Sequence, residues 1–258
     1  MKIMVIGSGG REHTLVWKIK KDNPKTKLFA VPGNGGIADL AECISGGTSK
    51  PEYILDIAIK NNIELTVVGP EVPLSEGISD VFIQNGLKIF GPVKKAAELE
   101  ASKSFAKEFM KRHSIPTADF EVVENFDESI QALKKKTFPC VIKYDGLAAG
   151  KGVIVAKEFD EGMDFLKKIY TDRIFGNKNN KVIIEDYLEG KEISYLIFTD
   201  TMDFIPMVPA KDYKRVFDND KGPNTGGMGC YSPPSLFNSI LEEQIQKKIV
   251  IPTLTGLQ

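Results

Sequence analysis

The sequence predicts an α/β protein in which an N-terminal parallel-sheet domain is followed by an α+β domain. The first hundred residues alternate short apolar runs with helix-like segments, as expected for β-α-β units. Glycine-rich turns follow the early apolar runs, at the strand ends where parallel sheets bind ligands. Beyond about residue 102 this alternation stops and strand-like runs lie closer together. We therefore expect two domains, residues 1–101 and residues 102–258.

The elements of the first domain are predicted by their hydrophobic periodicity. Apolar runs bounded by turn residues predict strands at 2–6, 27–31, 64–68 and 87–90. Helical spacing of apolar residues predicts helices at 12–21, 51–61 and 74–85. Each helix follows a strand, so we expect crossover connections between parallel strands.

The second domain opens with an amphipathic helix at 103–113, which Ser114-Ile115-Pro116 ends. Strand-like runs follow at 117–123, 140–143, 153–156, 182–186 and 193–198. Helices are expected at 128–136 and 161–170. Residues 211–229 are rich in charge and glycine, so they predict a functional loop and not a core element.

The composition favours a cytoplasmic protein whose partners are small molecules. The chain has 34 basic and 35 acidic residues, which gives no electrostatic reason to expect nucleic acid or membrane binding. Its 3 cysteines are widely spaced and form no C-x-x-C pattern, which argues against a disulfide framework and a zinc site. The N-terminus enters a strand directly, and no apolar run reaches the length of a membrane span.

The stretch from Lys143 to Gly152, K-Y-D-G-L-A-A-G-K-G, predicts a loop that covers phosphate groups. Glycines let backbone N–H groups approach an anion closely, and Lys143 and Lys151 supply positive charge. The stretch is not a P-loop, because Lys151 is followed by Gly152 instead of Ser or Thr and the next segment is a strand.

Two turns of the first domain are further candidates. The run from Gly7 to Gly10 aims backbone N–H groups at a phosphate or sugar phosphate, or it is only a tight turn. A dinucleotide site is disfavoured, because Glu12 occupies the sixth fingerprint position and no acidic residue ends the second strand. Glu71 follows the strand at 64–68, where it can accept from a ribose hydroxyl or an amine, or simply begin a helix.

Two acidic and two basic residues mark sites in the second domain. Glu185 and Glu192 are expected about one hairpin apart, one near a base and one on ribose hydroxyls, with a solvated hairpin tip as the alternative. Lys214 can neutralise phosphate, and Arg215 can grip a carboxylate through two hydrogen bonds. A disordered loop is the alternative for this stretch.

Six motifs in order along the chain resemble the glycinamide ribonucleotide synthetase family, ATP-grasp ligases of purine biosynthesis. They are G-S-G-G-R-E-H at 7–13, P-G-N-G-G at 32–36, V-G-P-E-V-P-L at 68–74, E-A-S-K-S-F at 100–105, D-G-L-A-A-G-K-G at 145–152 and G-P-N-T-G-G-M-G at 222–229. The resemblance implies a Rossmann-like, pre-ATP-grasp domain at 1–101 and an incomplete α+β ATP-grasp domain at 102–258. The latter includes a lid subdomain at about 117–190.

The resemblance also implies a set of ligand contacts. An adenine hinge at Glu185 to Leu188, a ribose contact at Glu192 and a closing loop at Gly146 to Gly152 belong to the nucleotide. The implied nucleotide contacts are Lys103, Lys143, Gly146, Leu147, Ala148, Ala149, Gly150, Lys151, Gly152, Glu185, Asp186, Tyr187, Leu188 and Glu192. Those of the phosphoribosylamine pocket are Gly9, Gly10, Asn34, Gly69, Pro70 and Glu71. Thr225, Gly226 and Gly227 are implied as substrate contacts near the reacting groups and phosphates. Those near the reacting groups are Asp212, Lys214, Arg215 and Asn224.

The implied reaction is the ATP-dependent ligation of glycine to 5-phosphoribosylamine through glycyl phosphate, giving glycinamide ribonucleotide, ADP and phosphate. The implied cofactors are ATP and Mg²⁺ or Mn²⁺. In this family the Glu and Asn ligands of the metal come from strands later than position 258, so we expect a fragment with no metal ligand of its own. The alternatives are a nucleotide-binding but inactive fragment and another ATP-grasp carboxylate–amine ligase.

Overall fold

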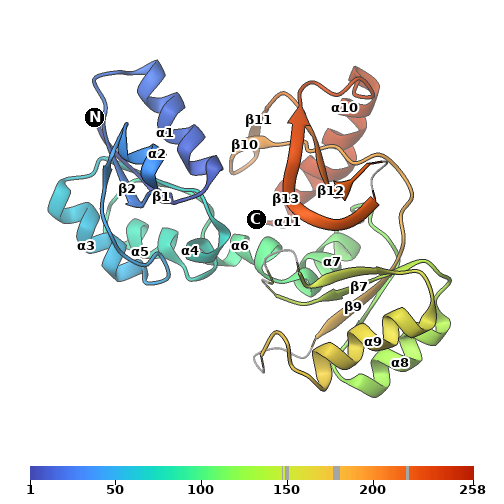
Figure 1. The fold of residues 1–258 in the computed structure, drawn as a ribbon. Helices are drawn as coiled ribbons and strands as arrows, with labels where there is room; N and C mark the ends of the chain where they lie inside the picture. Colours follow the sequence, from blue (N-terminus) through green and yellow to red (C-terminus); the bar gives the residue numbers. More distant parts are fainter. Residues whose placement is uncertain (147, 149–150, 177–180, 219–220) are drawn as a thin grey trace. The chain divides into compact units, whose positions relative to one another are not determined.

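The computed structural model describes residues 1–146, 148, 151–176, 181–218 and 221–258, without the side chains of residues 223 and 224. The chain forms two compact units, Met1–Ala101 and Ser102–Gln258. Figure 1 shows that each unit contains its own sheet and helices. The predicted fold class, an α/β chain with a parallel-sheet domain followed by an α+β domain, is confirmed, and the sheets of the second unit are antiparallel.

The first unit is built on a five-stranded parallel sheet in the order β3-β2-β1-β4-β5. Its strands are β1 (Lys2–Gly7), β2 (Lys27–Pro32), β3 (Glu42–Cys43), β4 (Leu65–Val68) and β5 (Ile89–Phe90). The register pairs Gly7 with Pro32 and Ile6 with Val68. The turns that follow β1, β2 and β4 therefore leave the sheet along the same edge, at the carboxyl ends of adjacent strands.

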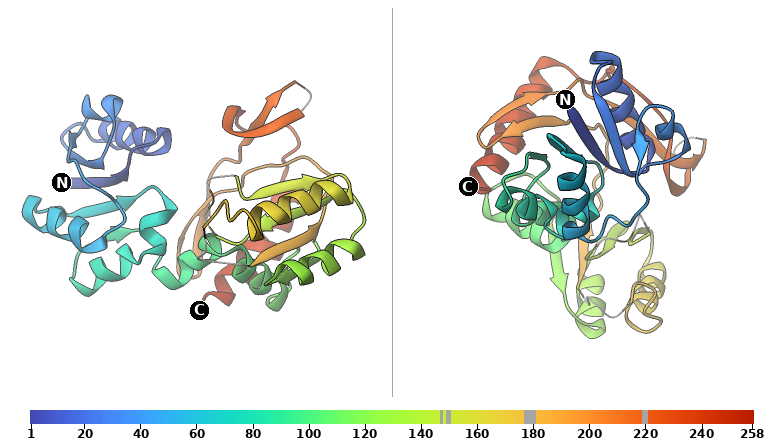
Figure 2. Two further views of the ribbon diagram at one scale, coloured as in Figure 1. Left: turned by 60° about the horizontal axis from the view of Figure 1, so that its bottom comes forward. Right: turned by 90° about the vertical axis from the view of Figure 1, so that its left-hand side faces the viewer.

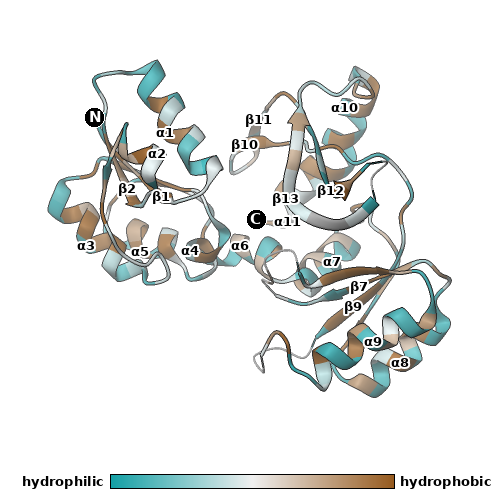
Figure 3. Ribbon diagram, viewed as in Figure 1, coloured by the Kyte–Doolittle hydropathy of each residue, from teal (hydrophilic) through white to brown (hydrophobic). Residues whose placement is uncertain are grey.

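Alternate side chains of β1 and β2 build a hydrophobic layer on each face of this sheet. Met4 and Ile6 pack with α3 (Pro51–Asn61) and α5 (Ile78–Gln84). On the opposite face, Val5 packs with residues of α1 (Gly10–Asp22) and α2 (Gly35–Ala38). Figure 3 shows that the strands of this sheet are mainly hydrophobic, whereas its helices contain both hydrophobic and hydrophilic residues. Burial on both faces is the expected environment of a parallel sheet.

The first unit differs from the sequence prediction in one divided helix and in three additional elements. The helix expected at 74–85 is divided into α4 (Glu71–Ser75) and α5, because Gly77 between them has φ +88°. This left-handed conformation favours glycine and interrupts a right-handed helix. The sequence prediction also lacks three elements, namely α2, β3 and α6 (Lys94–Ala101).

The second unit contains a four-stranded antiparallel sheet in the order β6-β9-β7-β8. Its strands are β6 (Phe120–Val123), β7 (Cys140–Tyr144), β8 (Val153–Ala156) and β9 (Val182–Asp186), and its neighbouring helices are α7 (Lys103–Arg112), α8 (Phe126–Lys135) and α9 (Phe159–Tyr170). Figures 1 and 2 show α8 and α9 side by side along one face. The elements expected at 103–113, 140–143, 153–156 and 182–186 are confirmed.

The strand period places apolar and charged residues of this sheet on opposite faces. Ile142 of β7 and Ile184 of β9 lie in a buried cluster with Leu133 of α8 and Leu166 of α9. Neighbouring side chains alternate in direction along a strand. Lys143 and Glu185 therefore point to the other face of the sheet, away from this core.

The remaining strands form two separate antiparallel pairs. They are β10 (Ile197–Asp200) with β11 (Asp203–Pro206), and β12 (Lys211–Phe217) with β13 (Lys221–Tyr231). The loop expected at 211–229 is thus wrong, since most of it lies in β12 and β13. The register shifts twice along this pair, and most of its described side chains are not buried, so no alternating apolar pattern is required. Ring stacking between Tyr213 and Tyr231, with centroids 6.1 Å apart, supports the pairing.

Two other details of the second unit correct the sequence prediction. The strand expected at 193–198 begins only at Ile197, and Ser194 forms an isolated bridge with Ala210. Glu185 and Glu192 are not joined by a hairpin, because residues 187–193 form no strand.

The unit ends in α10 (Ser239–Ile245), a π-helical turn, η1 (Gln246–Val250), and α11 (Ile251–Gly256). Within the described ranges, no helix combines the length and the apolar character that crossing a membrane requires.

Candidate functional site

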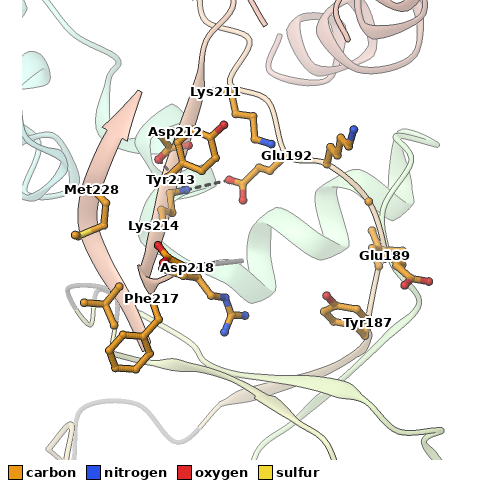
Figure 4. Close-up of a pocket in the computed structure, with 15 residues that line it drawn as sticks. Tyr187, Glu189, Glu192, Lys211, Asp212, Tyr213, Lys214, Phe217, Asp218 and Met228 are labelled. Carbon is orange, nitrogen blue, oxygen red and sulfur yellow. Dashed lines mark hydrogen bonds and ion pairs between the residues drawn. The ribbon is translucent and has the colours of Figure 1, made fainter. Parts of the chain in front are cut away.

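A cavity of about 1170 Å³ lies beside β12 in the second unit. It is lined by residues 187–192, residues 211–218 and Met228. Figure 4 shows Tyr187 and Glu189 on the segment after β9, while Asp212 and Lys214 extend from β12. The fold therefore brings part of the expected adenine hinge, the expected ribose residue and three expected reacting-group residues to one cavity.

Lys214 is the centre of the charged groups in this cavity. Its Nζ donates a hydrogen bond to Oε1 of Glu192 at 2.9 Å and lies 3.6 Å from Oδ2 of Asp212. The hydrogen bond to Glu192 raises the pKa of Lys214 above its ordinary value, and Asp212 adds to this rise while partial burial opposes it. The ammonium group therefore stays charged at neutral pH and is already held between two carboxylates.

The other expected reacting-group residues hold β12 to β13. Nη1 of Arg215 donates to the backbone oxygen of Gly222 at 2.9 Å. Oγ1 of Thr225 donates to the backbone oxygen of Lys214 at 2.9 Å and accepts from N of Gly227 at 3.1 Å. Asn224 and Gly226 lie in β13, and the side chain of Asn224 is outside the described atoms.

A buried ion cluster occupies the charged face of the four-stranded sheet. Glu185 is 5% exposed, and its carboxylate pairs with Lys143 of β7 and Lys107 of α7. Oε2 of Glu185 lies 2.5 Å from Nζ of Lys107 without hydrogen-bond geometry, so this contact is an ion pair. Nζ of Lys107 donates to Oγ1 of Thr117 at 2.6 Å. Glu185 thus fixes two ammonium groups and does not line the cavity beside β12.

Asp145 anchors the start of the glycine-rich loop to the first turn of α7. Its carboxylate accepts from the backbone N and Oγ of Ser104, at 3.1 and 2.5 Å, and from Oγ of Ser102 at 3.2 Å. Between the two serines, Nζ of Lys103 donates to the backbone oxygen of Gly146 at 2.7 Å. Asp145 is only 2% exposed. The loop base is therefore held before any ligand binds.

Backbone hydrogen bonds hold the described part of the glycine-rich loop, among them one from N of Asp145 to the oxygen of Lys181 at 3.0 Å. Lys151 donates through its N to the oxygen of Ala148 at 2.9 Å, and Tyr144 donates to the oxygen of Gly152 at 2.7 Å. Of the loop residues expected to contact the nucleotide, Leu147, Ala149 and Gly150 lie outside the described residues. Asp186 lies in register with Cys140, exposed and paired with Lys136 at 2.7 Å.

The first unit has a smaller cavity, of about 380 Å³, at the carboxyl ends of its central strands. Its walls come from residues 7–9, residues 46–48, Glu12, Pro32, Pro70 and Val72. Of the residues expected to contact phosphoribosylamine, Gly9 and Pro70 line it directly. The cavity lies where the turns after β1, β2 and β4 meet, as expected for a ligand site of a parallel sheet.

The other expected substrate residues of the first unit support these turns. Asn34 caps α2 by accepting from N of Ile37 at 2.8 Å, and its Nδ2 donates to the backbone oxygen of Ser8 at 2.8 Å. Gly69 donates through its N to the oxygen of Ile6 at 3.0 Å. Glu71 begins α4, and Gly10 begins α1. None of these four lines the cavity, which is described in full within residues 1–101.

The described residues do not form a metal site. Among them, no three or more His, Cys, Asp or Glu side chains come together to hold an ion. Asp212 and Glu192 come nearest in chemistry, but both contact the ammonium group of Lys214. The carboxylates of this cavity therefore do not fit Mg²⁺ as they stand.

Two family models together match the whole chain. The phosphoribosylglycinamide synthetase N domain matches residues 1–100, and the ATP-grasp (A) domain of the same synthetase matches residues 101–258. The chain belongs to the phosphoribosylglycinamide synthetase family. The resemblance seen in the six sequence motifs is thereby confirmed.

Individual members of the family are similar along the full chain. Phosphoribosylamine-glycine ligase of Clostridium acetobutylicum is 47% identical over 258 residues, which are 100% of this chain and 62% of that protein. The same ligase of Halalkalibacterium halodurans is 46% identical over 257 residues, covering 100% of this chain and 60% of the relative. The crystal structure of the Thermotoga maritima ligase has 33% identity and a TM-score of 0.83, covering 99% of this chain and 61% of that one. The chain thus spans about three fifths of the length of these relatives.

Three buried residues that hold candidate site residues in place were not singled out as site residues from the sequence. Glu12 is buried beneath the first glycine turn, Asp145 holds the loop base and Lys107 pairs with Glu185. Glu12 had a detectable signal, because it stands three residues after the helix N-cap Gly9, where a capping-box carboxylate is found. Lys107 had none, since its partner is on a strand far along the chain.

Proposed function

We propose that the chain carries the nucleotide- and sugar-binding parts of an ATP-dependent ligase that joins glycine to 5-phosphoribosylamine. The products are glycinamide ribonucleotide, ADP and phosphate, in purine biosynthesis in the cytoplasm. The observation that carries this proposal is the match of both synthetase domains along the whole chain. The cavity beside β12 supports it, because it combines aromatic, carboxylate and ammonium groups as a nucleotide requires.

In this proposal ATP occupies the cavity beside β12. The adenine lies against the segment of Tyr187 and Leu188, and the ribose hydroxyls donate to Glu192. Lys214 is then released from Glu192 and turns toward the phosphates. A side chain that changes partners in this way keeps its charge neutralised in both states, which limits the cost of desolvation. Lys103 and Lys143 contribute to phosphate binding by a similar exchange of their present partners.

The chemistry needs no nucleophile from the protein. The γ-phosphoryl group of ATP passes to a carboxylate oxygen of glycine, giving glycyl phosphate and ADP. The amine of 5-phosphoribosylamine attacks the acyl carbon, phosphate leaves, and an amide bond forms. Lys214 and Arg215 neutralise the charge that develops on the oxygens, and positioning supplies the rest of the acceleration. Exclusion of water from the site protects the acyl phosphate from hydrolysis.

ATP is proposed to bind together with Mg²⁺ or Mn²⁺, which neutralises phosphate charge when bound. The described residues form no metal site, so no protein ligand is assigned to the ion here. Oδ2 of Asp212 lies 3.6 Å from Nζ of Lys214 and forms an ion pair that helps to orient the ammonium group.

Glycine-dependent release of ADP tests the proposal. The chain is incubated with ATP, Mg²⁺, glycine and freshly generated 5-phosphoribosylamine, and ATP affinity is measured separately by calorimetry. Lys214→Ala is expected to lower turnover about 10²-fold, the loss typical of one electrostatic group at a transferring phosphoryl centre. Lys247→Ala is the matched control, because Lys247 pairs with Glu243 on the exposed face of α10.

The two measurements separate the candidate functions. Turnover that depends on glycine and on Lys214 supports the ligase. ATP binding without turnover supports a nucleotide-binding part that is inactive by itself. Absence of ATP binding contradicts both.

A further inference from the structure

Glu12 is a buried carboxylate in the first turn of α1. It is 4% exposed, and its Oε2 accepts a hydrogen bond from N of Gly9 at 2.6 Å. It occupies the third position of the helix, where the positive end of the helix dipole stabilises negative charge. The fold therefore keeps an acidic group at the site where a glycine turn would otherwise present only N–H donors to an anion.

Three glycines make room for this side chain. A Cβ atom at Gly7 would lie 2.5 Å from Cγ of Glu12, and one at Gly9 would lie 2.9 Å from Oε2. A Cβ at Gly69, on the turn after β4, would collide with Oε1 of Glu12. Two turns from different strands thus close around one carboxylate, with Oε1 on the Gly69 side and Oε2 on the Gly9 side.

The carboxylate is part of the cavity of the first unit. Among the residues that line the cavity, all of them described, Glu12 is the only charged one. The hydroxyls of Ser8 and Thr48 and the backbone of glycine turns supply the other polar groups. Within residues 1–101, Oε1 of Glu12 accepts no hydrogen bond, while Oε2 is taken by Gly9. Glu12 therefore lines the cavity with a buried carboxylate of which only one oxygen is engaged by a hydrogen bond within this unit.

The charge of Glu12 decides which end of a ligand lies beside it. A phosphate group beside a buried carboxylate suffers like-charge repulsion in a region of low dielectric, and the cavity lining contains no cationic side chain to offset it. A sugar hydroxyl has the opposite character, because it donates to the carboxylate and accepts from the N–H groups of a turn.

We propose that Glu12 is a specificity-determining residue that accepts a hydrogen bond from a hydroxyl of a pentose 5-phosphate and keeps the phosphate away from this end of the cavity. The inference rests on the proposed sugar-phosphate substrate and adds its orientation. The glycines at 7, 9 and 69 then serve mainly to admit the carboxylate, in addition to any contact with the ligand.

Calorimetry with ribose 5-phosphate and methyl phosphate on the full chain tests this. Glu12→Gln keeps an acceptor for Gly9 but presents an amide NH₂ to the cavity, so affinity for ribose 5-phosphate is expected to fall about 10-fold. Affinity for methyl phosphate, which has no sugar hydroxyl, is expected to stay the same or rise. Glu52→Gln is the matched control, an exposed glutamate in the first turn of α3, and is expected to change neither affinity.

Equal affinity of Glu12→Gln and the parent chain for ribose 5-phosphate overturns the proposal. An equal loss for both ligands also overturns it, because that result indicates a purely structural role. Fluorescence of Trp17, on the same helix, reports whether the variant folds. If it does not fold, the parent chain still decides, because methyl phosphate binding as tightly as ribose 5-phosphate excludes a hydroxyl contact. Loss of ATP binding concerns the ligase proposal alone, since it is measured with a different ligand.

Discussion

Removing the charge of Glu185 tests whether the ion cluster under the four-stranded sheet stabilises the second unit. The carboxylate is 5% exposed and lies between the ammonium groups of Lys107 and Lys143. Glu185→Gln leaves both cations without a counter-ion at nearly unchanged volume. Removing one partner of a buried ion pair costs about 3–5 kcal/mol of stability.

The structure places the expected loss near the lower end of that range. The side chain of Lys143 is 27% exposed, so water takes over part of its solvation, and Lys107 keeps its hydrogen bond to Thr117. We therefore expect a loss of about 3 kcal/mol in the free energy of unfolding. With a urea dependence of about 2 kcal/mol per M, the midpoint of unfolding of the second unit falls by about 1.5 M.

The neighbouring residue Asp186 provides a matched control. Its carboxylate is 51% exposed and pairs with Lys136 at 2.7 Å. Because exposed pairs contribute about 0–1 kcal/mol, Asp186→Asn is expected to move the midpoint by no more than about 0.5 M. The two variants remove the same charge from adjacent positions of β9, so they differ in burial and in the number of ammonium groups that lose their partner.

Thiol labelling across a urea series reports the second unit by itself. Cys140 is fully buried on β7, whereas Cys43 and Cys230 are exposed. In a Cys43→Ser, Cys230→Ser background, labelling of Cys140 follows opening of the sheet, while Trp17 fluorescence follows the first unit. The reasoning is refuted if Glu185→Gln and Asp186→Asn shift the Cys140 midpoint equally.

Two further predictions concern the first unit and alkaline pH. Gly69→Ala places a methyl group against Oε1 of Glu12, so the free energy of unfolding of the first unit, followed by Trp17 fluorescence, is expected to fall by about 1–3 kcal/mol. Gly10→Ala, with open space around it, is expected to leave this free energy unchanged. A similar midpoint in both variants contradicts the close packing around Glu12. Burial raises the pKa of the Cys140 thiol above its ordinary value of 9.0, so the thiol ionises first in the unfolded chain. The stabilisation that the neutral thiol gives the folded state is therefore complete below pH 9 and is lost as pH rises further. Urea unfolding is expected to show a lower free energy of unfolding at pH 10 than at pH 8, and Cys140→Ser is expected to remove the part of this difference that comes from the thiol.

The parallel sheet of the first unit is predictable because its information is local. Each strand is a short apolar run closed by turn residues, and each following helix has a clear periodicity, as at 51–61, where the expected and observed ends agree. The split between α4 and α5 depends on the conformation of one glycine at 77. A single residue with positive φ leaves little trace in a hydrophobic pattern.

The β12–β13 pair was not predictable by the same rules. Its strands contain the charged run from Lys211 to Arg215 and four glycines between 222 and 229, and its described side chains are mostly exposed. Strand signals rest on burial of one face, so a pair without a buried face lacks them. The cavity beside β12 depends on this pairing, so its existence was not predictable from the sequence either. Most of the charged residues that line it had nevertheless been predicted as site residues.

Buried carboxylates explain why glycines and small polar residues surround the cavity of the first unit and the base of the glycine-rich loop. Glu12 requires space from Gly7, Gly9 and Gly69, and Asp145 is enclosed by the backbone and hydroxyls of the first turn of α7. A carboxylate that accepts several hydrogen bonds fixes the groups that donate to it. Lys103 stands between the two serines that Asp145 holds, so Asp145 helps to set the direction of its side chain toward Gly146. Motif residues of this chain therefore act in two layers, with acidic groups beneath positioning the glycines and lysines above them.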